Sequence, residues 1–304
     1  MLDMGFQEAL DNIISYMPTQ RQTMLFSATY PSKIENIAKR IMQSPVTVEV
    51  QDSHSKQSIV QTLYQVESDE SRIEAVQLLL QAHQPETTLI FCNTKIETDQ
   101  VANALRAAGY EALALHGDLE QKQRDQTLVR FSNRSASVLV ATDVAARGLD
   151  IEALDLVINY QVARELEVHT HRIGRTGRAG AQGLACTLHT QKENHKIGLL
   201  EDYLKQKLER DDLPPIKLLR QPPFSPAMVT IQIGGGKKQK VRAGDIVGAL
   251  TGADGIPGTE IGRIQVGDQW AYVAVTQAYG NTAFNKLSEG KLKGRNFKVR
   301  RLRG

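Results

Sequence analysis

Cysteine is scarce in this sequence of 304 residues: the two cysteines, Cys92 and Cys186, each stand inside an apolar run, LIFCN and GLACTL. A disulfide or cysteine-based metal framework is therefore not expected, and a reducing compartment fits best. No apolar run approaches the roughly 18 residues that a membrane-spanning helix requires. The opening stretch MLDMGFQEAL has no apolar signal-peptide core. We therefore expect a cytoplasmic protein, and with 41% apolar and 23% charged residues a globular one rather than a disordered, collagenous or coiled-coil chain.

Acidic residues are scarce in the last quarter of the chain. From Pro222 to Gly304 there are 13 lysines and arginines against 5 aspartates and glutamates, a net charge of +8. The rest of the chain holds 24 against 29, a net charge of −5. A basic module attached to a mildly acidic body favours a polyanionic partner, and nucleic acid is the commonest one. A merely solvated basic surface is the alternative.

The sequence also lacks the phosphate loop G-x-x-x-x-G-K-[S/T] of nucleotide-binding enzymes. Its two Gly-Lys steps, at Gly236 and Gly290, continue with lysine and leucine instead of serine or threonine. The one adjacent Asp-Glu pair, Asp69-Glu70, follows polar residues rather than an apolar strand. We interpret that pair as a helix N-cap and not as a magnesium-binding acidic motif. The chain by itself is thus not expected to hydrolyse a nucleoside triphosphate.

Proline and polar stretches divide the chain into four parts. Five prolines between Leu213 and Pro226 prevent a continuous helix or a central strand there, which predicts a linker at 214–226. A weaker, polar break lies between Val50, which ends the strand-like stretch VTVEV, and Ile59. We therefore predict an N-terminal segment at 1–50, a main domain at 51–213 and a basic module at 227–304.

Short apolar runs alternate with helical patterns in the predicted main domain. LIFCN, for example, precedes a helical stretch that ends at Gly109, and SVLVATD precedes a glycine-containing turn. Such alternation predicts an α/β fold with a parallel sheet covered by helices on both faces. The basic module instead shows the order β-α-β-β-α-β, with a hairpin turning at Gly267-Asp268, an order shared by RNA-recognition modules and many unrelated proteins.

Three arginines lie three residues apart in the segment HRIGRTGRAG: Arg172, Arg175 and Arg178. On a helix or tight turn this spacing directs guanidinium groups to one side, and their planar forks suit phosphate oxygens. The intervening glycines allow a ligand to approach the backbone. A solvated basic loop remains the alternative for any single arginine.

A second segment, SVLVATDVAARGLDI, begins with an apolar run that predicts a buried strand ending at Thr142-Asp143. The carboxyl end of such a strand is where open α/β sheets bind ligands. It offers Arg147 to a phosphate, Gly148 for close approach and Asp150 to ribose hydroxyls. The alternative for Asp143 is that it caps the next helix.

Together these segments resemble motifs V and VI of the DEAD-box RNA helicases. Further segments stand in the family's order: SAT at 27–29 is similar to motif III, LIFCNT at 89–94 to motif IV, and HGD at 116–118 with Gln121 and Arg124 to the segment that follows. MLDMGF resembles the stretch that follows the family's acidic tetrapeptide. The resemblance implies a RecA-like fold for the main domain and places residues 1–50 at the end of a first RecA-like domain. That first domain would supply the phosphate loop and the acidic motif that bind ATP with Mg²⁺, so no metal bound by this chain is expected.

The resemblance also implies roles for individual residues. Arg175 and Arg178 would be catalytic arginine fingers, worth on the order of 10³ or more in rate. Gly148 and Asp150 would bind ATP, and Thr94, Gly117, Arg124, Thr142 and Arg147 would contact the RNA backbone. Ser27 and Thr29, and also His171 and Arg172 at the interface of the two core domains, would couple nucleotide state to RNA binding.

The basic module has few aromatic residues for stacking bases. Its first strand, MVTIQI, has none, and its third carries Trp270 and Tyr272. We therefore expect RNA to contact basic loops and edges, with these candidates: Lys237, Lys238, Lys240, Arg242 and Arg263. For the lysine-rich turn GGGKKQK a flexible exposed loop is the alternative.

The module resembles the RNA-binding domain of bacterial members of the family, which implies a structured hairpin of large-subunit ribosomal RNA as target. We thus expect part of an ATP-dependent RNA helicase that unwinds short RNA duplexes during assembly of the large ribosomal subunit and acts as a monomer. The alternative is a non-catalytic RNA-binding module.

Overall fold

The computed structural model describes residues 7–26, 32–48, 59–147, 154–177 and 182–302. It separates into two compact units, residues 1–53 and 54–304. The described part of the first unit contains two helices, α1 (Gln7–Ser15) and α2 (Ser32–Ile41). The stretch VTVEV, which the pattern marks as a strand, forms none in its described residues, and Val46 and Val48 are 88% and 78% exposed. Residues 19–26 of the same unit lie across one hollow from it, but the described residues of the two segments form no strand pairing.

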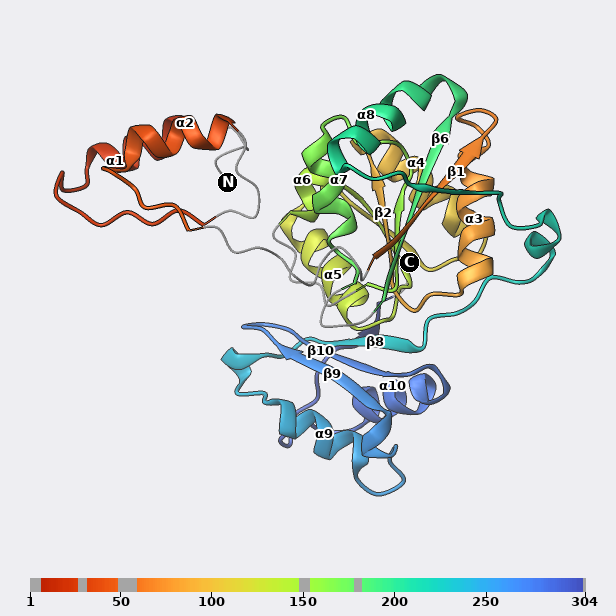
Figure 1. The fold of residues 1–304 in the computed structure, drawn as a ribbon. Helices are drawn as coiled ribbons and strands as arrows, with labels where there is room; N and C mark the ends of the chain where they lie inside the picture. The colour runs from red at the N-terminus through yellow and green to blue at the C-terminus, as the bar shows by residue number, and fades with distance from the viewer. Residues whose placement is uncertain (1–6, 27–31, 49–58, 148–153, 178–181, 303–304) are drawn as a thin grey trace. The chain divides into compact units, whose positions relative to one another are not determined.

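The second unit begins with an α/β domain, residues 54–212 (Figure 1). Its strands are β1 (Ile59–Val66), β2 (Thr88–Cys92), β3 (Ala112–Leu115), β4 (Val138–Thr142), β5 (Leu156–Asn159), β6 (Gly183–Thr190) and β7 (Glu209–Asp211). Its helices are α3 (Arg72–His83), α4 (Lys95–Ala107), α5 (Gln121–Ser132), α6 (Asp143–Ala146), α7 (Leu166–Ile173) and α8 (Asn194–Leu204), with a short 3₁₀ turn, η2 (Gln191–Glu193), before α8. The strands form one sheet in the order β3-β4-β2-β5-β6-β1-β7, and every pairing is parallel.

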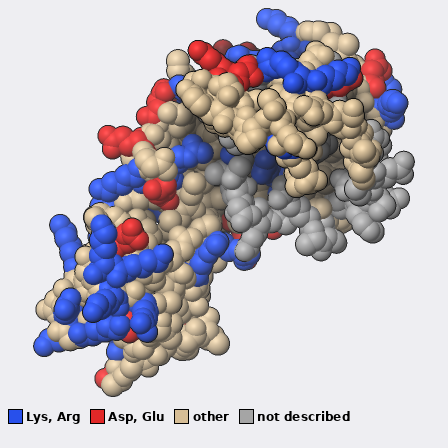
Figure 2. Space-filling view, turned by 90° about the vertical axis from the view of Figure 1, so that its left-hand side faces the viewer, with Lys and Arg blue, Asp and Glu red and all other residues tan. Residues whose placement is uncertain are grey.

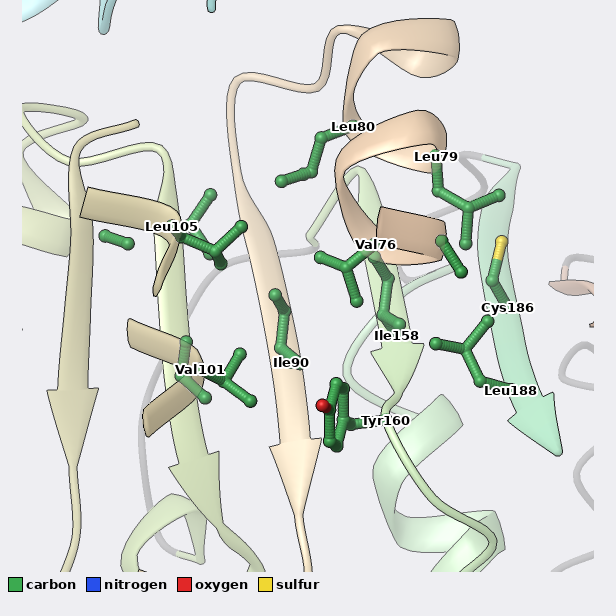
Figure 3. Close-up of a cluster of buried hydrophobic side chains, with 14 of the residues drawn as sticks. Val76, Leu79, Leu80, Ile90, Val101, Leu105, Ile158, Tyr160, Cys186 and Leu188 are labelled. Atoms are coloured by element: carbon green, nitrogen blue, oxygen red, sulfur yellow. The ribbon is translucent and has the colours of Figure 1, made fainter. Parts of the chain in front are cut away.

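Helices cover both faces of this sheet, as the alternation of apolar runs predicts. Because successive strand residues point to opposite faces, Ile90 packs under α3 and α4 while its neighbours Leu89 and Phe91 pack against α5, α6 and α7. Figure 3 shows the first of these layers, with Val76, Leu79 and Leu80 of α3 and Val101 and Leu105 of α4 directed at the strands. Both cysteines are free thiols that are fully buried in this layer, so they act as small apolar side chains.

The C-terminal module, residues 227–304, has its own core. It contains β8 (Met228–Ile233), α9 (Ala243–Thr251), β9 (Ile261–Val266), β10 (Ala271–Thr276), α10 (Gly280–Glu289) and β11 (Val299–Arg301), with 3₁₀ turns η4 (Lys237–Gln239), η5 (Gly258–Glu260) and η6 (Gln277–Tyr279). The sheet is antiparallel in the order β11-β8-β10-β9. This is the predicted β-α-β-β-α-β arrangement, with the apolar side chains of Ile231, Ile233, Val273 and Val275 packed with those of α9 and α10.

The proline-rich segment between the two parts of this unit is ordered against the α/β domain. It forms the 3₁₀ helix η3 (Ile216–Arg220) after Pro215. Leu213 and Phe224 pack on the core under α3 and α4, and the ring of Phe224 lies edge-on to Tyr110 with centroids 5.8 Å apart.

The acidic pair Asp69-Glu70 lies one turn before α3, but it does not cap that helix. The N-cap residue is Ser71, and the Asp69 carboxylate accepts from Nε of the buried Arg72 at 2.8 Å. The arginine at the first helical position binds the Asp69 carboxylate, and the N-cap is Ser71, the residue directly after the predicted pair.

Candidate functional site

Four neighbouring strands of the parallel sheet, β3, β4, β2 and β5, end at one edge, and polar side chains follow each of them. Thr94 follows β2, Gly117 follows β3, Asp143 follows β4 and Gln161 follows β5. Carboxyl ends of parallel strands meet at the same edge, so segments up to 79 residues apart in the chain are brought together there, as the hydrogen bond from Arg172 to Asn93 shows. This edge is where open α/β sheets bind ligands.

Arg172 of α7 holds these loops together. Its Nε and Nη2 donate to the two oxygens of the Asp143 carboxylate at 2.6 and 2.8 Å. Nη2 also donates to Oδ1 of Asn93 at 2.8 Å, and Nη1 donates to the Gln161 carbonyl at 2.9 Å. The guanidinium lies 5.2 Å from the ring centroid of Phe91. Every side of the fork is thus occupied.

The position of Arg172 differs from the expectation. We expected it to face a neighbouring core domain with its guanidinium on the side of Arg175, but its side chain is 1% exposed. The Asp143 carboxylate, directly after β4, attracts the guanidinium of Arg172 into the core. Arg172 therefore joins the loops after β2, β4 and β5 instead of offering its charge to a ligand. Asp143 correspondingly does not cap α6, whose N-cap is Thr142.

Arg175 is placed differently, in the turn after α7, where it is partly exposed. It lines a shallow hollow together with Phe91, Asp143, Ala146, Arg147, Val168, His171 and Arg172. Two partly exposed arginines, Arg147 and Arg175, therefore share one concave surface at the edge of the sheet. This surface presents positive charge at the edge of the sheet.

Several predicted residues lie outside the described residues. They are Ser27, Thr29, Gly148, Asp150 and Arg178. Their predicted roles stay predictions.

Of the predicted RNA-contacting residues of the α/β domain, Arg147 lines this hollow. The others lie at strand ends of the same sheet edge, except Arg124, which lies on α5. Thr94 is the N-cap of α4: its Oγ1 accepts from the backbone N–H of Glu97 at 3.2 Å. Thr142 caps α6 in the same way, at 3.4 Å from the N–H of Ala145. Arg124 donates from Nη2 to the Ala145 carbonyl at 2.8 Å and so ties α5 to α6. Gly117 is exposed, beside an ion pair between Lys95 and Asp118 that joins the loops after β2 and β3.

The interior beneath these loops disfavours extra charge. Burial, with Arg172 nearby as a smaller cause, lowers the pKa of His169 to about 4. A neutral His169 donates from Nε2 to the side-chain oxygen of Gln61, 3.1 Å away. Burial also raises the pKa of the Cys92 thiol well above its usual range. Both groups are therefore uncharged at neutral pH, and Arg172 is the cation that this part of the core accommodates.

The C-terminal module presents the basic residues that its composition predicts. Figure 2 shows lysine and arginine side chains gathered over its surface. The five predicted residues are all exposed: Lys237, Lys238, Lys240, Arg242 and Arg263. The lysine-rich turn is structured rather than loose, because the backbone N–H groups of Lys237 and Lys238 donate to the carbonyls of Gly267 and Asp268 at 2.8 and 3.0 Å.

Metal binding and membrane insertion find no support in the described ranges. There, no group of three or more His, Cys, Asp or Glu side chains is placed to hold a metal ion. Within the same ranges no helix has the length and apolarity needed to cross a membrane.

Comparison with known proteins identifies both parts of the second unit. Residues 71–180 match the model of the helicase conserved C-terminal domain, and residues 230–301 match the DbpA RNA binding domain. The ATP-dependent RNA helicase DbpA of Escherichia coli is 46% identical over 303 residues, and DbpA of Bacillus subtilis is 34% identical over 320. The chain belongs to the DEAD-box family of ATP-dependent RNA helicases. These matches cover 100% and 98% of this chain but only 66% and 67% of the two relatives, so the chain spans about two thirds of their length.

A solved structure supports the RecA-like fold predicted for the α/β domain. Dbp5 of Saccharomyces cerevisiae, bound to RNA and ADP BeF3, superposes with a TM-score of 0.64 at 28% identity. The similarity covers 70% of this chain and 57% of Dbp5.

The sequence interpretation missed three residues of the site. Asn93 and Gln161 were not singled out, although both follow buried strands and the strand-end rule that selected Asp143 also applies to them. Glu97 was also missed: its carboxylate accepts from Thr94 Oγ1 at 2.8 Å and from Gln161 Nε2 at 2.5 Å. Only the folded chain shows that α4 and the loop after β5 share this carboxylate.

Proposed function

We propose that this chain is part of an ATP-dependent RNA helicase that separates short RNA duplexes. The observation that carries the proposal is the hollow at the strand ends, where Arg147 and Arg175 share one surface held by the buried Arg172–Asp143 pair. In this proposal Arg175 and Arg178 stabilise the negative charge that develops on the transferred phosphoryl group. Gly148 and Asp150 contact the nucleotide. Positioning and electrostatic stabilisation are most of what such catalysis needs, so two guanidinium groups carry a large share.

RNA is proposed to lie along the loops beside the hollow. The residues that would contact its sugar-phosphate backbone are Thr94, Gly117, Arg124, Thr142 and Arg147. Backbone contacts read the shape of RNA and not its base sequence. Ser27, Thr29 and His171 would couple the nucleotide state to this RNA contact. Arg172 would do so by holding the loops that contain Asn93, Asp143 and Gln161 in one geometry.

The arginines of this chain suit the phosphate groups of ATP, but its described residues offer no ligand cluster for Mg²⁺. The sequence has no phosphate loop, and the described residues hold no cluster of metal ligands. Mg²⁺ bound with ATP would shield the charge of the phosphates, and groups outside these 304 residues would have to hold the ion. We therefore expect no ATP hydrolysis by this chain alone.

The C-terminal module is proposed to direct the helicase to a structured hairpin of large-subunit ribosomal RNA, and thereby to assembly of that subunit. Support comes from the net charge of +8 in the last quarter and from the match to the DbpA RNA binding domain. We place the functional boundaries at 1–50, 51–213, 214–226 and 227–304, and we propose a cytoplasmic monomer.

Reconstitution tests the catalytic half of the proposal. The separately produced first RecA-like domain of Escherichia coli DbpA is mixed with this chain, and phosphate release is measured with saturating ribosomal RNA and Mg-ATP. We expect no turnover by either part alone and measurable turnover by the mixture. Arg175→Ala and Arg178→Ala should each reduce the recovered rate by about 10³, whereas Arg220→Ala, an exposed arginine of η3, should leave it unchanged. Equal rates for the three variants would refute the assignment of the arginine fingers.

The alternative function is a non-catalytic RNA-binding module, and the high basic charge of the last quarter is the observation that favours it. It predicts that the chain binds ribosomal RNA but restores no turnover in that mixture. Ribosomal RNA binding without recovered turnover would therefore decide for the alternative.

A further inference from the structure

Two threonines of the proposed RNA contact, Thr94 and Thr142, occupy equivalent places in the fold. Thr94 follows β2 and Thr142 ends β4, and these two strands pair in parallel with Cys92 opposite Thr142. Each threonine is partly exposed and is the N-cap of the next helix, where its hydroxyl accepts from the N–H three residues further on. The residue at that third position differs, because it is Glu97 in α4 and Ala145 in α6.

Glu97 takes the hydroxyl proton of Thr94. The oxygens Thr94 Oγ1 and Glu97 Oε2 are 2.8 Å apart, and because a carboxylate only accepts, the hydroxyl donates in this contact. Thr94 Oγ1 also accepts from the N–H of Glu97 at 3.2 Å. A hydroxyl has one donor and two acceptor lone pairs. Thr94 can therefore still offer a ligand one lone pair, but no proton.

The Glu97 carboxylate is also held from its other side. Its Oε1 accepts from Nε2 of Gln161 at 2.5 Å, and the backbone carbonyl of Gln161 accepts from the buried Arg172 at 2.9 Å. Both carboxylate oxygens thus have partners, and a network in which every member is satisfied holds its side chains in one geometry. The proton position at Thr94 is therefore set by the same contacts that hold the loops at the strand ends.

Thr142 has the opposite polarity. Its hydroxyl accepts from the N–H of Ala145 at 3.4 Å, and the side chain of Ala145 has no polar atom to receive the hydroxyl proton. Among the contacts of the described residues, none takes this proton. Thr142 can therefore donate to a ligand, whereas Thr94 can only accept.

The backbone of a nucleic acid offers different partners to these two hydroxyls. Phosphate oxygens only accept, so they suit Thr142. The ribose 2′-hydroxyl can donate, and DNA lacks it. We propose that Thr94 accepts a hydrogen bond from a ribose 2′-hydroxyl, and that Glu97 is the positioning residue that makes this contact selective for RNA over DNA. The contact between Thr94 and RNA belongs to the proposed function, on which this role of Glu97 rests.

Sugar substitution in the probe tests the contact on the unmodified full chain. The probe is a labelled hairpin fragment of large-subunit ribosomal RNA with a single-stranded extension made of ribose, 2′-deoxyribose or 2′-fluororibose nucleotides. The hairpin binds the exposed basic edge of the C-terminal module and thereby raises the local concentration of the extension at the loops. The 2′-fluoro sugar keeps the pucker of ribose but cannot donate. We expect both substituted extensions to bind roughly fivefold more weakly than ribose, the factor that one neutral hydrogen bond contributes. Equal affinities for ribose and 2′-fluororibose would overturn the proposal.

Variants of Glu97 test whether this preference arises at Thr94. Glu97→Leu releases the hydroxyl proton of Thr94 to a phosphate oxygen, so the ratio of the 2′-fluoro to the ribose dissociation constant should fall roughly threefold or more. Glu97→Gln keeps a side-chain oxygen that accepts this proton and should preserve the ratio. The matched control is Glu74→Leu, which removes an exposed carboxylate from the first turn of α3. That loss of charge should shift both dissociation constants alike. Equal ratios for Glu97→Leu and Glu74→Leu would refute the role of Glu97.

A cycle with Thr94→Val separates hydroxyl polarity from a general distortion of the loop. Thr94→Val has no hydroxyl, so adding Glu97→Leu to it should leave the ratio unchanged, whereas a distortion would lower the ratio in both backgrounds. A further fall of the ratio in the Thr94→Val background would therefore contradict the proposal.

Failure of the proposed function gives a different result. If the ribose extension adds no affinity to the hairpin, the RNA contact at the loops is wrong, and the role of Glu97 falls with it. If the extension adds affinity but Glu97→Leu keeps the ratio, the RNA contact stands and only the role of Glu97 is overturned. If the hairpin itself does not bind, the proposed ribosomal target fails, and the same ratios measured with the single-stranded extension alone decide the role of Glu97.

Discussion

The buried pair of Arg172 and Asp143 allows a quantitative prediction about the site. Arg172→Met keeps most of the apolar stem but removes the fork that donates to Asp143 at 2.6 and 2.8 Å, to Asn93 and to the Gln161 carbonyl. Asp143, 25% exposed, is then left without its counter-charge. Removing one partner of a buried pair costs about 3–5 kcal/mol of unfolding free energy, because the remaining charge stays buried.

The assay is urea unfolding followed by circular dichroism, with Trp270 fluorescence as a separate reading of the C-terminal module. With a slope of about 2 kcal/mol per molar urea, the midpoint of the α/β domain should fall by about 2 M. The matched control is Glu86→Gln, which breaks the exposed 2.5 Å pair with Arg134, in which both side chains are more than half exposed. That change should cost less than about 1 kcal/mol.

A double variant separates lost charge pairing from lost packing. In Arg172→Met with Asp143→Leu no unpaired carboxylate remains, so the cost should be smaller than that of Arg172→Met with Asp143 intact. The reasoning is refuted if Arg172→Met costs no more than Glu86→Gln. It is also refuted if the double variant is less stable than the single one.

Three further predictions follow from individual contacts. Because the pKa of His169 is lowered to about 4 in the fold, the unfolded chain alone takes up a proton between about pH 6.5 and 4, and the native state should lose about 3 kcal/mol over that range as pH falls. Urea midpoints at pH 7 and 4.5 measure this, and His169→Gln should flatten the profile; an unchanged profile would contradict it. Thr94→Val removes the N-cap of α4 and should cost about 1 kcal/mol of unfolding free energy, whereas Thr94→Ser should cost little. Binding of the full chain to the ribosomal RNA fragment should weaken by roughly 10³ between 50 and 200 mM salt if about six phosphates are neutralised, and a flat salt dependence would exclude the basic edge as the contact.

Periodicity and punctuation in the sequence were sufficient for the architecture of the second unit. The alternation of buried runs such as LIFCN with helical stretches predicted a parallel sheet covered on both faces, and the order of elements in the module was correct throughout. These signals are local, because whether a residue faces the core repeats every two or 3.6 residues along the chain. The ordered motifs likewise sufficed for the family.

Only the tertiary structure decided three features: the burial of Arg172, the surroundings of Trp270 and the conformation of VTVEV. Three arginines at equal spacing look alike in sequence, yet Asp143 draws one of them into the core while Arg175 stays at the hollow. Trp270 and Tyr272 read as a sparse stacking platform until α5 is seen to lie against them. VTVEV has the composition of a strand, but its described residues, Val46 to Val48, form none. For Arg172 and Trp270 the deciding partner is distant in the sequence, because a side chain's charge, exposure or pairing depends on what the fold brings next to it.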